Sequence, residues 1–176
     1  MTQPTHSDEF CERCWSFDPL AASRSEDDPA LDVITSGTIF FDIIFAGRPR
    51  IPVPGEELWS TGLGSCPGGI ANLATALARL GLRTGLVAGF GDDTYADWIW
   101  ETLLEQEHIN LASSPRYENF HTSLTVAVTV EGDRAMVTHG HDLPESLSSY
   151  ILAAPASRTA VVDLGGETYW WHRAVR

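Results

Sequence analysis

A glycine pair that opens a helix constrains this chain more than any other feature of its sequence. Gly68-Gly69 directly precedes a run with helical spacing, and Gly81 stands where that helix would end. Apolar positions recur every three or four residues, as on one helix face: Ile70, Leu73, Ala74, Leu77 and Ala78. Glycine just beyond a helix is typical of a left-handed cap. Because glycines before a helix leave its first N–H groups open to a ligand, the pattern predicts a site for a polar or anionic small molecule.

A second glycine turn follows this predicted helix. Residues 84–89 have the composition of a short strand, and the turn Gly91-Asp92-Asp93 comes next. Either Asp92 or Asp93 can cap a second helix, because a short carboxylate side chain accepts hydrogen bonds from the first N–H groups. The stripe of that helix that we expect to face a sheet contains Tyr95, Trp98, Ile99, Thr102, Leu103 and Gln106.

The remaining segments complete an alternation of strands and helices. Buried strands are predicted at 31–37 and 159–164, and helices at 143–153 and from residue 167 onward. This alternation implies an α/β fold with a parallel sheet and right-handed crossovers. Residues 40–62 and 123–139 break the alternation, and we expect them to form a small antiparallel sheet set apart from the main one.

Composition limits the classes of partner that we expect and indicates a cellular compartment. Residues 1–30 are rich in Ser, Asp, Glu and Pro without apolar periodicity, which predicts a disordered leader before a domain over 31–176. The formal net charge of −13 argues against nucleic acid or an anionic membrane surface as a partner. There is no secretory segment and no apolar run of membrane-spanning length. With three cysteines and neither of these segments, we predict a cytoplasmic protein.

Together these motifs resemble the N-terminal half of the ribokinase-like (PfkB-type) carbohydrate kinases. Residues that match the first glycine signature of that family are Gly68, Gly69, Asn72, Ala74, Gly81 and Gly91. Further matches are Gly37 with Asp42, Pro54-Gly55-Glu56, Gly91-Asp92-Asp93 and Leu164-Gly165-Gly166. The resemblance covers residues 31–176. It implies a three-layer α/β/α fold with a mostly parallel sheet and a small antiparallel β lid.

The resemblance also implies a function, which is ATP-dependent phosphoryl transfer to a hydroxyl of a sugar or nucleoside. It assigns to Asp42 the carboxylate that accepts hydrogen bonds from sugar hydroxyls, a role that suits a group able to accept two at once. Gly68 and Gly69 would let the sugar lie against the backbone, and Asn72 would offer a donor and an acceptor. The lid would exclude water from the transferred phosphoryl group.

The chain departs from the family pattern in several places. Only Ile70 and Ala71 separate the glycine pair from Asn72, which is one residue fewer than usual, and Phe40 and Ala96 replace a polar residue and a glycine. The family's Gly-x-Gly-Asp motif has no counterpart after residue 166. Because its Asp is the general base and the ATP and Mg²⁺ sites lie nearby, we expect a substrate-binding half that is inactive alone.

Other functions remain open at this stage. The chain is alternatively a non-catalytic relic that binds a sugar or a partner protein. A third, weaker alternative is an NAD-type enzyme, although the glycines at 62, 64 and 68 miss the dinucleotide spacing by one residue. We also expect a homodimer through the lid or an exposed sheet edge.

Cysteines and histidines supply the remaining candidates for chemistry. Cys11 and Cys14 have the spacing of half a zinc site, but no second pair exists, so two thiols in a mobile tail are favoured. His139 and His141 would lie on one strand face beside Asp142, where an exposed hairpin end is favoured over a metal site. Cys66 is interpreted as a small buried thiol.

Overall fold

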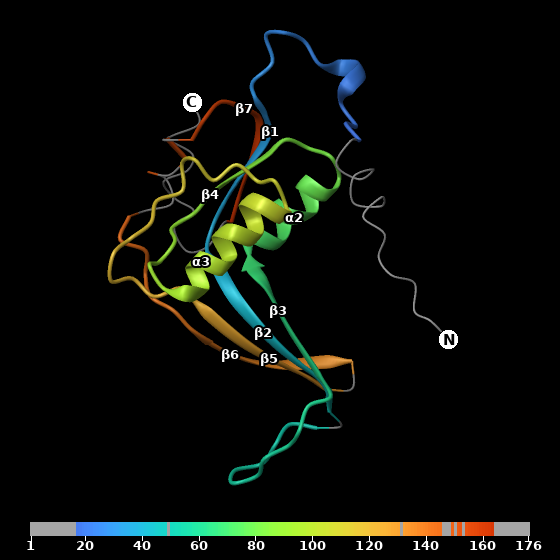
Figure 1. Ribbon diagram of the computed structural model, residues 1–176, viewed down its shortest axis with the longest axis vertical. Coiled ribbons are helices and arrows are strands. Elements are labelled where there is room, and N and C mark those ends of the chain that lie inside the picture. The colour runs from blue at the N-terminus through green and yellow to red at the C-terminus, as the bar shows by residue number, and fades with distance from the viewer. Residues whose placement is uncertain are drawn as a thin grey trace.

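The computed structural model describes residues 17–48, 50–130, 132–145, 149, 151–152 and 154–163 of the 176-residue chain. They form two sheets, with two helices packed beside the first (Figure 1). The elements in chain order are η1 (Ala21–Ser23), β1 (Leu31–Ser36), β2 (Ile39–Arg48), β3 (Gly62–Gly69), α2 (Ile70–Arg79), β4 (Thr84–Val87), α3 (Thr94–Glu101), η2 (Thr102–Gln106), β5 (Leu124–Val130), β6 (Asp133–His139) and β7 (Ser157–Val162). Within the described residues, every helix is too short or too polar to cross a bilayer.

The first sheet is parallel and has the strand order β4-β1-β7. The central strand β1 is buried along its whole length. The strand predicted at 159–164 is present as β7, but residues 158–161 are exposed. The expectation that it is buried is therefore wrong, because among the described strands β7 pairs with β1 alone and lies at an edge of this sheet.

The second sheet has the strand order β3-β2-β5-β6 and corresponds to the predicted lid. Strand β2 is antiparallel to β3, and β5 is antiparallel to β6, as expected. However, β2 and β5 are parallel, so the sheet is mixed and not antiparallel. The reason is that β3, α2, β4 and α3 lie between them in the chain and return it to the same end. The sheet extends away from the helices, and the β2–β3 connection projects beyond it (Figure 1).

Helix α2 begins directly after Gly69 and ends before Gly81, whose φ of 87° confirms the predicted left-handed position. The buried residues of this helix are Ile70, Ala71, Ala74 and Ala78. Leu73, predicted to face the core, is 38% exposed. The helix is thus rotated so that its alanines face the sheet, and small side chains allow a close approach.

Helix α3 is capped by Asp93, whose side chain accepts a hydrogen bond from the backbone N–H of Ala96 at 2.8 Å. It continues into the π-helical segment η2. From the predicted stripe, Ile99, Thr102 and Leu103 are buried. Tyr95 and Trp98 remain partly exposed, and their rings instead pack on Phe41 of β2 at centroid distances of 4.8 and 5.2 Å. These ring contacts join α3 to the second sheet.

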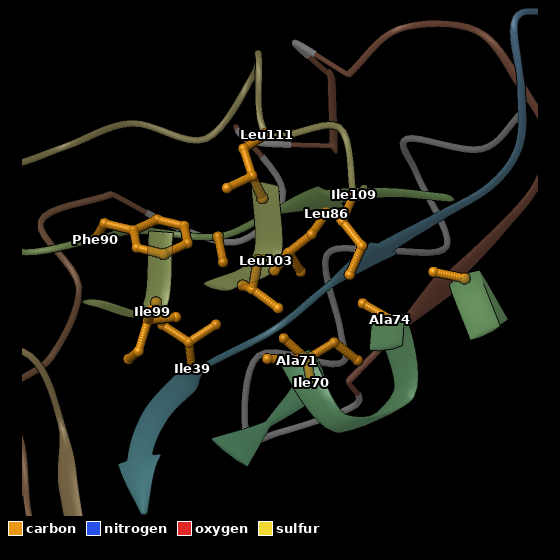
Figure 2. Close-up of a cluster of buried hydrophobic side chains, with 12 residues drawn as sticks. Ile39, Ile70, Ala71, Ala74, Leu86, Phe90, Ile99, Leu103, Ile109 and Leu111 are labelled. Atoms are coloured by element: carbon orange, nitrogen blue, oxygen red, sulfur yellow. The ribbon is translucent and has the colours of Figure 1, made fainter. Parts of the chain in front are cut away.

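The main hydrophobic core lies between the two helices and the sheets (Figure 2). Its buried members are Ile39, Ile70, Ala71, Ala74, Ala78, Leu86, Ala88, Phe90, Ile99, Leu103, Ile109 and Leu111. A smaller cluster of Leu31, Ile34 and Val87 packs against Leu143 and Ala154, among others. Leu143, the first residue of the predicted helix 143–153, and Ala154, directly after it, therefore contact the parallel sheet.

The segment before β1 differs from the predicted disordered leader. Residues 21–23 form the short helix η1, and the Arg24 guanidinium binds the buried carboxylate of Asp32 with N–O distances of 2.5 and 2.8 Å. Residues 17–30 are thus fixed to the start of β1 by an ion pair. The leader up to residue 16, with Cys11 and Cys14, lies outside the described residues, as do Leu164-Gly165-Gly166 and the helix predicted from residue 167.

Candidate functional site

The candidate site lies where β2 and β3 meet the start of α2. Phe40 pairs with Gly68, and Asp42 pairs with Cys66, so Asp42 and Gly68 lie on the same face of the second sheet. A Cβ atom added to Gly68 would overlap the carboxylate group of Asp42. The carboxylate therefore occupies space that only a glycine leaves free, and the structure brings these two predicted site residues together.

Gly69 is required by the backbone at this junction. Its φ is 63°, and an added Cβ would overlap the carbonyl oxygen of Thr38 and lie 2.8 Å from the Phe40 ring. The next residue, Ile70, donates its N–H to the same Thr38 oxygen at 3.1 Å. The geometry of the turn thus explains this glycine without a ligand, and its predicted contact with a sugar stays a prediction.

Asn72 lies in the first turn of α2, three residues after Gly69. Its side chain is exposed, and in the part of the chain that the structure describes it makes no hydrogen bond with Asp42. The structure therefore brings Asp42, Gly68 and Gly69 together and places Asn72 one turn further along the chain. That Asn72 and Asp42 bind one ligand remains a prediction.

A row of polar side chains extends from Asp42 across the second sheet. Cys66, Asp42, Thr125 and Thr138 stand in register on the four neighbouring strands β3, β2, β5 and β6. Thr125 is the register neighbour of Asp42 on the same face, where its hydroxyl is placed to donate to the carboxylate, and that hydroxyl lies 3.1 Å from that of Thr138. The alternation of residues 123–130 predicted a strand with Thr125 on one face. No signal in the sequence gave the register that places Thr125 beside Asp42.

The electrostatics of Asp42 follow from this environment. Burial raises the pKa of the Asp42 carboxyl, and the hydrogen bond from Thr125 offsets part of that rise. Burial and the nearby Asp42 charge both raise the pKa of the Cys66 thiol. No cation among the described residues pairs with Asp42. The carboxylate therefore keeps accepting capacity for the hydroxyl groups of a ligand.

The turn Gly91-Asp92-Asp93 has a structural role. Besides capping α3, Asp93 accepts hydrogen bonds from the backbone N–H and the hydroxyl of Thr122, at 2.7 and 2.8 Å. Although burial opposes it, these hydrogen bonds lower the pKa of Asp93. Asp92 accepts from the N–H of Asn119 at 2.8 Å. Both carboxylates thus hold the segment that leads into β5, the strand that carries Thr125.

The motif Pro54-Gly55-Glu56 forms a turn in the loop between β2 and β3. Glu56 forms an ion pair with Arg50 and accepts from the N–H of Val53 at 3.1 Å, and these contacts lower the pKa of Glu56 to about 2. This loop borders a groove of about 490 Å³ lined by Phe45, Glu57, Leu58, Trp59, Ser60, Leu63, Val126 and Val128. By strand alternation the groove lies on the face opposite Asp42.

The histidines near the end of β6 form an exposed group. The rings of His139 and His141 lie 5.0 Å apart, and those of His121 and His141 lie 6.4 Å apart. Nevertheless, no three His, Cys, Asp or Glu side chains in the described ranges are arranged to hold a metal ion. His139 and His141 are both exposed, as the interpretation of a hairpin end expects, but β6 ends at His139, so His141 lies beyond the strand and not on its face.

Comparison with solved structures supports the predicted ribokinase-like fold. A ribokinase from Cryptococcus neoformans var. grubii serotype A, in complex with ADP, is 29% identical and has a TM-score of 0.52 over 75% of this chain and 49% of its own. A protein provisionally described as a ribokinase from Agrobacterium tumefaciens is 18% identical and has a TM-score of 0.63. The match covers 76% of this chain and 44% of that protein. A ribokinase from Arabidopsis thaliana, complexed with ribose and ATP, is 23% identical and has a TM-score of 0.54. The match covers 64% of this chain and 36% of that ribokinase.

The chain spans between a third and a half of the length of these structures. No curated protein matches it. A family model described as pfkB family carbohydrate kinase matches residues 61–159, which include the glycine pair, α2 and the strands that carry Thr125 and Thr138. Because this match covers more than half of the chain, the protein belongs to the PfkB family of carbohydrate kinases.

Proposed function

We propose that this chain supplies the substrate-binding part of an ATP-dependent kinase that phosphorylates a hydroxyl of a sugar or nucleoside. One observation carries the proposal most directly. The Asp42 carboxylate packs on the bare Cα of Gly68, next to the start of a helix, and no cation of the described residues lies beside it. A partly buried carboxylate of this kind needs hydrogen-bond donors, and the vicinal hydroxyls of a sugar are suitable donors.

The proposed binding mode uses the predicted site residues as one set. Asp42 accepts from two hydroxyls, Gly68 and Gly69 allow the sugar to approach the backbone, and the exposed amide of Asn72 contacts a further hydroxyl. The second sheet then limits the access of water, which would otherwise compete for the phosphoryl group. Support for this assignment comes from the family match over residues 61–159 and from a fold neighbour complexed with ribose.

ATP and Mg²⁺ are the cofactors that we propose for the whole kinase. Two fold neighbours carry ATP or ADP. Among the described residues, no cluster of acidic, histidine or cysteine side chains suits a metal ion, so Mg²⁺ is not assigned to a residue of this chain. Because the chain spans less than half of the length of those neighbours, we propose that it binds sugar but does not transfer phosphate alone.

The proposal extends to partners and compartment. A small-molecule sugar or nucleoside is the proposed ligand, and a net charge of −13 disfavours nucleic acid and anionic membranes. We also propose a cytoplasmic location and a homodimer that forms through the second sheet. The exposed apolar groove on that sheet supports self-association.

Isothermal titration calorimetry tests the proposal directly. The chain is titrated with D-ribose, D-fructose and adenosine, and we expect one of them to bind. The Asp42→Asn variant keeps the shape of the side chain but removes its charge, and should weaken binding at least about tenfold. Asp133→Asn, at an exposed hairpin turn, is the matched control. Equal binding by the Asp42 variant, or no binding to any of the three ligands, would contradict the proposal.

A coupled assay with ATP and Mg²⁺ tests the second half of the proposal. We expect no phosphorylation of the bound sugar by the 176-residue chain, and detectable turnover would contradict this part. A partner-binding relic is the alternative, favoured by a groove that includes Trp59, which is 86% exposed. In that case sugar binding is absent while the fold is intact, as judged by a cooperative unfolding transition.

A further inference from the structure

We propose that Thr125, supported by Thr138, is a positioning residue that aims the Asp42 carboxylate at the hydroxyl groups of the sugar. This inference rests on the proposed function of Asp42. The resemblance and the sequence patterns assigned no role to either threonine. Both residues lie outside the glycine motifs, on strands β5 and β6 of the second sheet.

The geometry that supports this inference is a cross-strand row. Asp42 is the register partner of Thr125 in the parallel pair β2–β5, and Thr125 is the partner of Thr138 in the antiparallel pair β5–β6. Directly opposed residues point to the same face of a sheet, so the three polar groups lie side by side. Thr125 is only 8% exposed, which shields its hydroxyl from competition by water.

The direction of each hydrogen bond in the row follows from the chemistry of the groups. An ionised carboxylate can only accept, so the hydroxyl hydrogen of Thr125 is donated to Asp42. The oxygen of Thr125 then accepts from the Thr138 hydroxyl, 3.1 Å away. Thr138 is exposed, and its oxygen accepts from solvent. All hydrogen bonds in the row therefore run in one direction, toward Asp42. The bond from Thr138 to Thr125 strengthens the bond from Thr125 to Asp42.

This row also stabilises the charge on Asp42. The titratable group that faces Asp42 from β3 is Cys66, and the groups beside it on β2 are the apolar Phe40 and Ile44. Burial raises the pKa of Asp42, and the Thr125 hydrogen bond is the contact that lowers it. Since no cation of the described chain pairs with Asp42, loss of the Thr125 hydroxyl should move its pKa further upward.

The test uses three substitutions, all on strand β5. Thr125→Val replaces the hydroxyl with a methyl group of similar size, and Thr125→Ser restores a hydroxyl. Thr129→Val is the matched control, because Thr129 lies on the same face of β5 but its hydroxyl donates to the backbone of Phe45. Circular dichroism and urea unfolding establish that each variant is folded.

The first readout is the titration of the Asp42 side-chain carboxyl, followed by ¹³C NMR without any sugar. We expect Thr125→Val to raise the midpoint by about one pH unit, the effect of one hydrogen bond to a charged group. Thr125→Ser should return the midpoint close to that of the unmodified chain, and Thr129→Val should leave it unchanged. An unchanged midpoint in Thr125→Val, or a serine variant that behaves like the valine variant, overturns the inference.

The second readout is the pH dependence of affinity, by calorimetry, for whichever of D-ribose, D-fructose and adenosine the unmodified chain binds. Because the ionised carboxylate is the acceptor, affinity should fall as the pH is lowered through the Asp42 midpoint. In Thr125→Val this fall should begin about one pH unit higher. A sugar profile that does not move with the midpoint overturns the positioning role. If the unmodified chain binds none of D-ribose, D-fructose and adenosine at any pH, the proposed function fails, and the carboxyl titration still decides whether Thr125 controls Asp42.

Discussion

At the scale of single residues, Gly69 is a position where the backbone does not accept a side chain. Its φ of 63° is unfavourable for other residues, and an added Cβ would overlap the Thr38 carbonyl oxygen. We expect Gly69→Ala to lower the free energy of unfolding by about 2–4 kcal/mol. Urea denaturation measures the change.

The matched control is Gly64→Ala on the same strand β3. Nothing lies within 4 Å of a Cβ at Gly64, and its φ is not in the left-handed region. The free energy of unfolding should therefore change by less than about 0.5 kcal/mol. Equal losses in the two variants would show that glycine itself, and not the geometry at Gly69, decides stability.

A second prediction at the residue scale concerns Asp32, whose contribution to stability should depend on pH. Hydrogen bonds from Arg24 hold the pKa of this 4% exposed aspartate well below its ordinary value, outweighing its burial. A depressed folded-state pKa contributes stability above the unfolded pKa of about 3.9, and that contribution is lost as pH falls below it. Asp32→Asn should therefore cost about 3 kcal/mol at pH 7, and the difference from the unmodified chain should shrink between about pH 5 and pH 2.

Denaturant unfolding at several pH values measures this dependence. Asp18→Asn is the control, because Asp18 binds the same Arg24 side chain but is 37% exposed. Its effect on stability should be smaller than that of Asp32→Asn. A constant difference between Asp32→Asn and the unmodified chain across this pH range would mean that the Asp32 charge contributes nothing.

The roles of individual residues were predictable where local backbone geometry determines them. Gly81 has the left-handed conformation expected after a helix, and Asp93 is one of the two N-caps that the sequence offered. Thr125 was not predicted, because its contact with Asp42 depends on the register of two strands more than 80 residues apart. Leu73 was wrongly placed in the core, since helical periodicity gives a stripe but not the rotation of the helix against the sheet.

At the scale of elements, Asp93 connects the start of α3 with the entry to β5. It accepts from Ala96 in the helix and from Thr122 before the strand. Asp93→Ala should lower the free energy of unfolding by about 2 kcal/mol or more, because it removes a helix cap and leaves two partly buried donors without a partner. Asp92→Ala removes only the bond from Asn119 and should lose less than half as much in urea denaturation. Equal losses of unfolding free energy in the two variants would show that Asp93 does not connect the two elements.

The elements themselves were largely predictable, but their pairing was not. Alternating Thr and Val gave β5, and the glycine turns bounded α2. The parallel pairing of β2 with β5 was missed, because local patterns favour hairpins between neighbouring segments and carry no signal for a pair separated by two helices. The same limit applies to the site, since its glycine motif is local and its threonine row is not.

At the scale of the whole molecule, the second sheet has two chemically different faces. One face carries the polar row with Asp42, and the other carries the apolar groove with Trp59 and Leu63, which are 86% and 73% exposed. Val137, opposite Val126 in the register, lies on the same face as the groove and is 75% exposed. A face of this kind on a small acidic chain is expected to be covered by another surface, since exposed apolar patches favour association.

We expect the chain to self-associate through the groove face. Sedimentation velocity over a range of concentrations should detect dimers in the unmodified chain. The double substitution Trp59→Ser with Leu63→Ser should raise the dissociation constant at least about tenfold, because exposed aromatic and aliphatic anchors dominate such interfaces. Met136→Ser is the control, because Met136 is 56% exposed on the opposite face of the same sheet. A monomer at every concentration, or a larger effect of the Met136 substitution, would exclude this face and leave the groove available to a different partner.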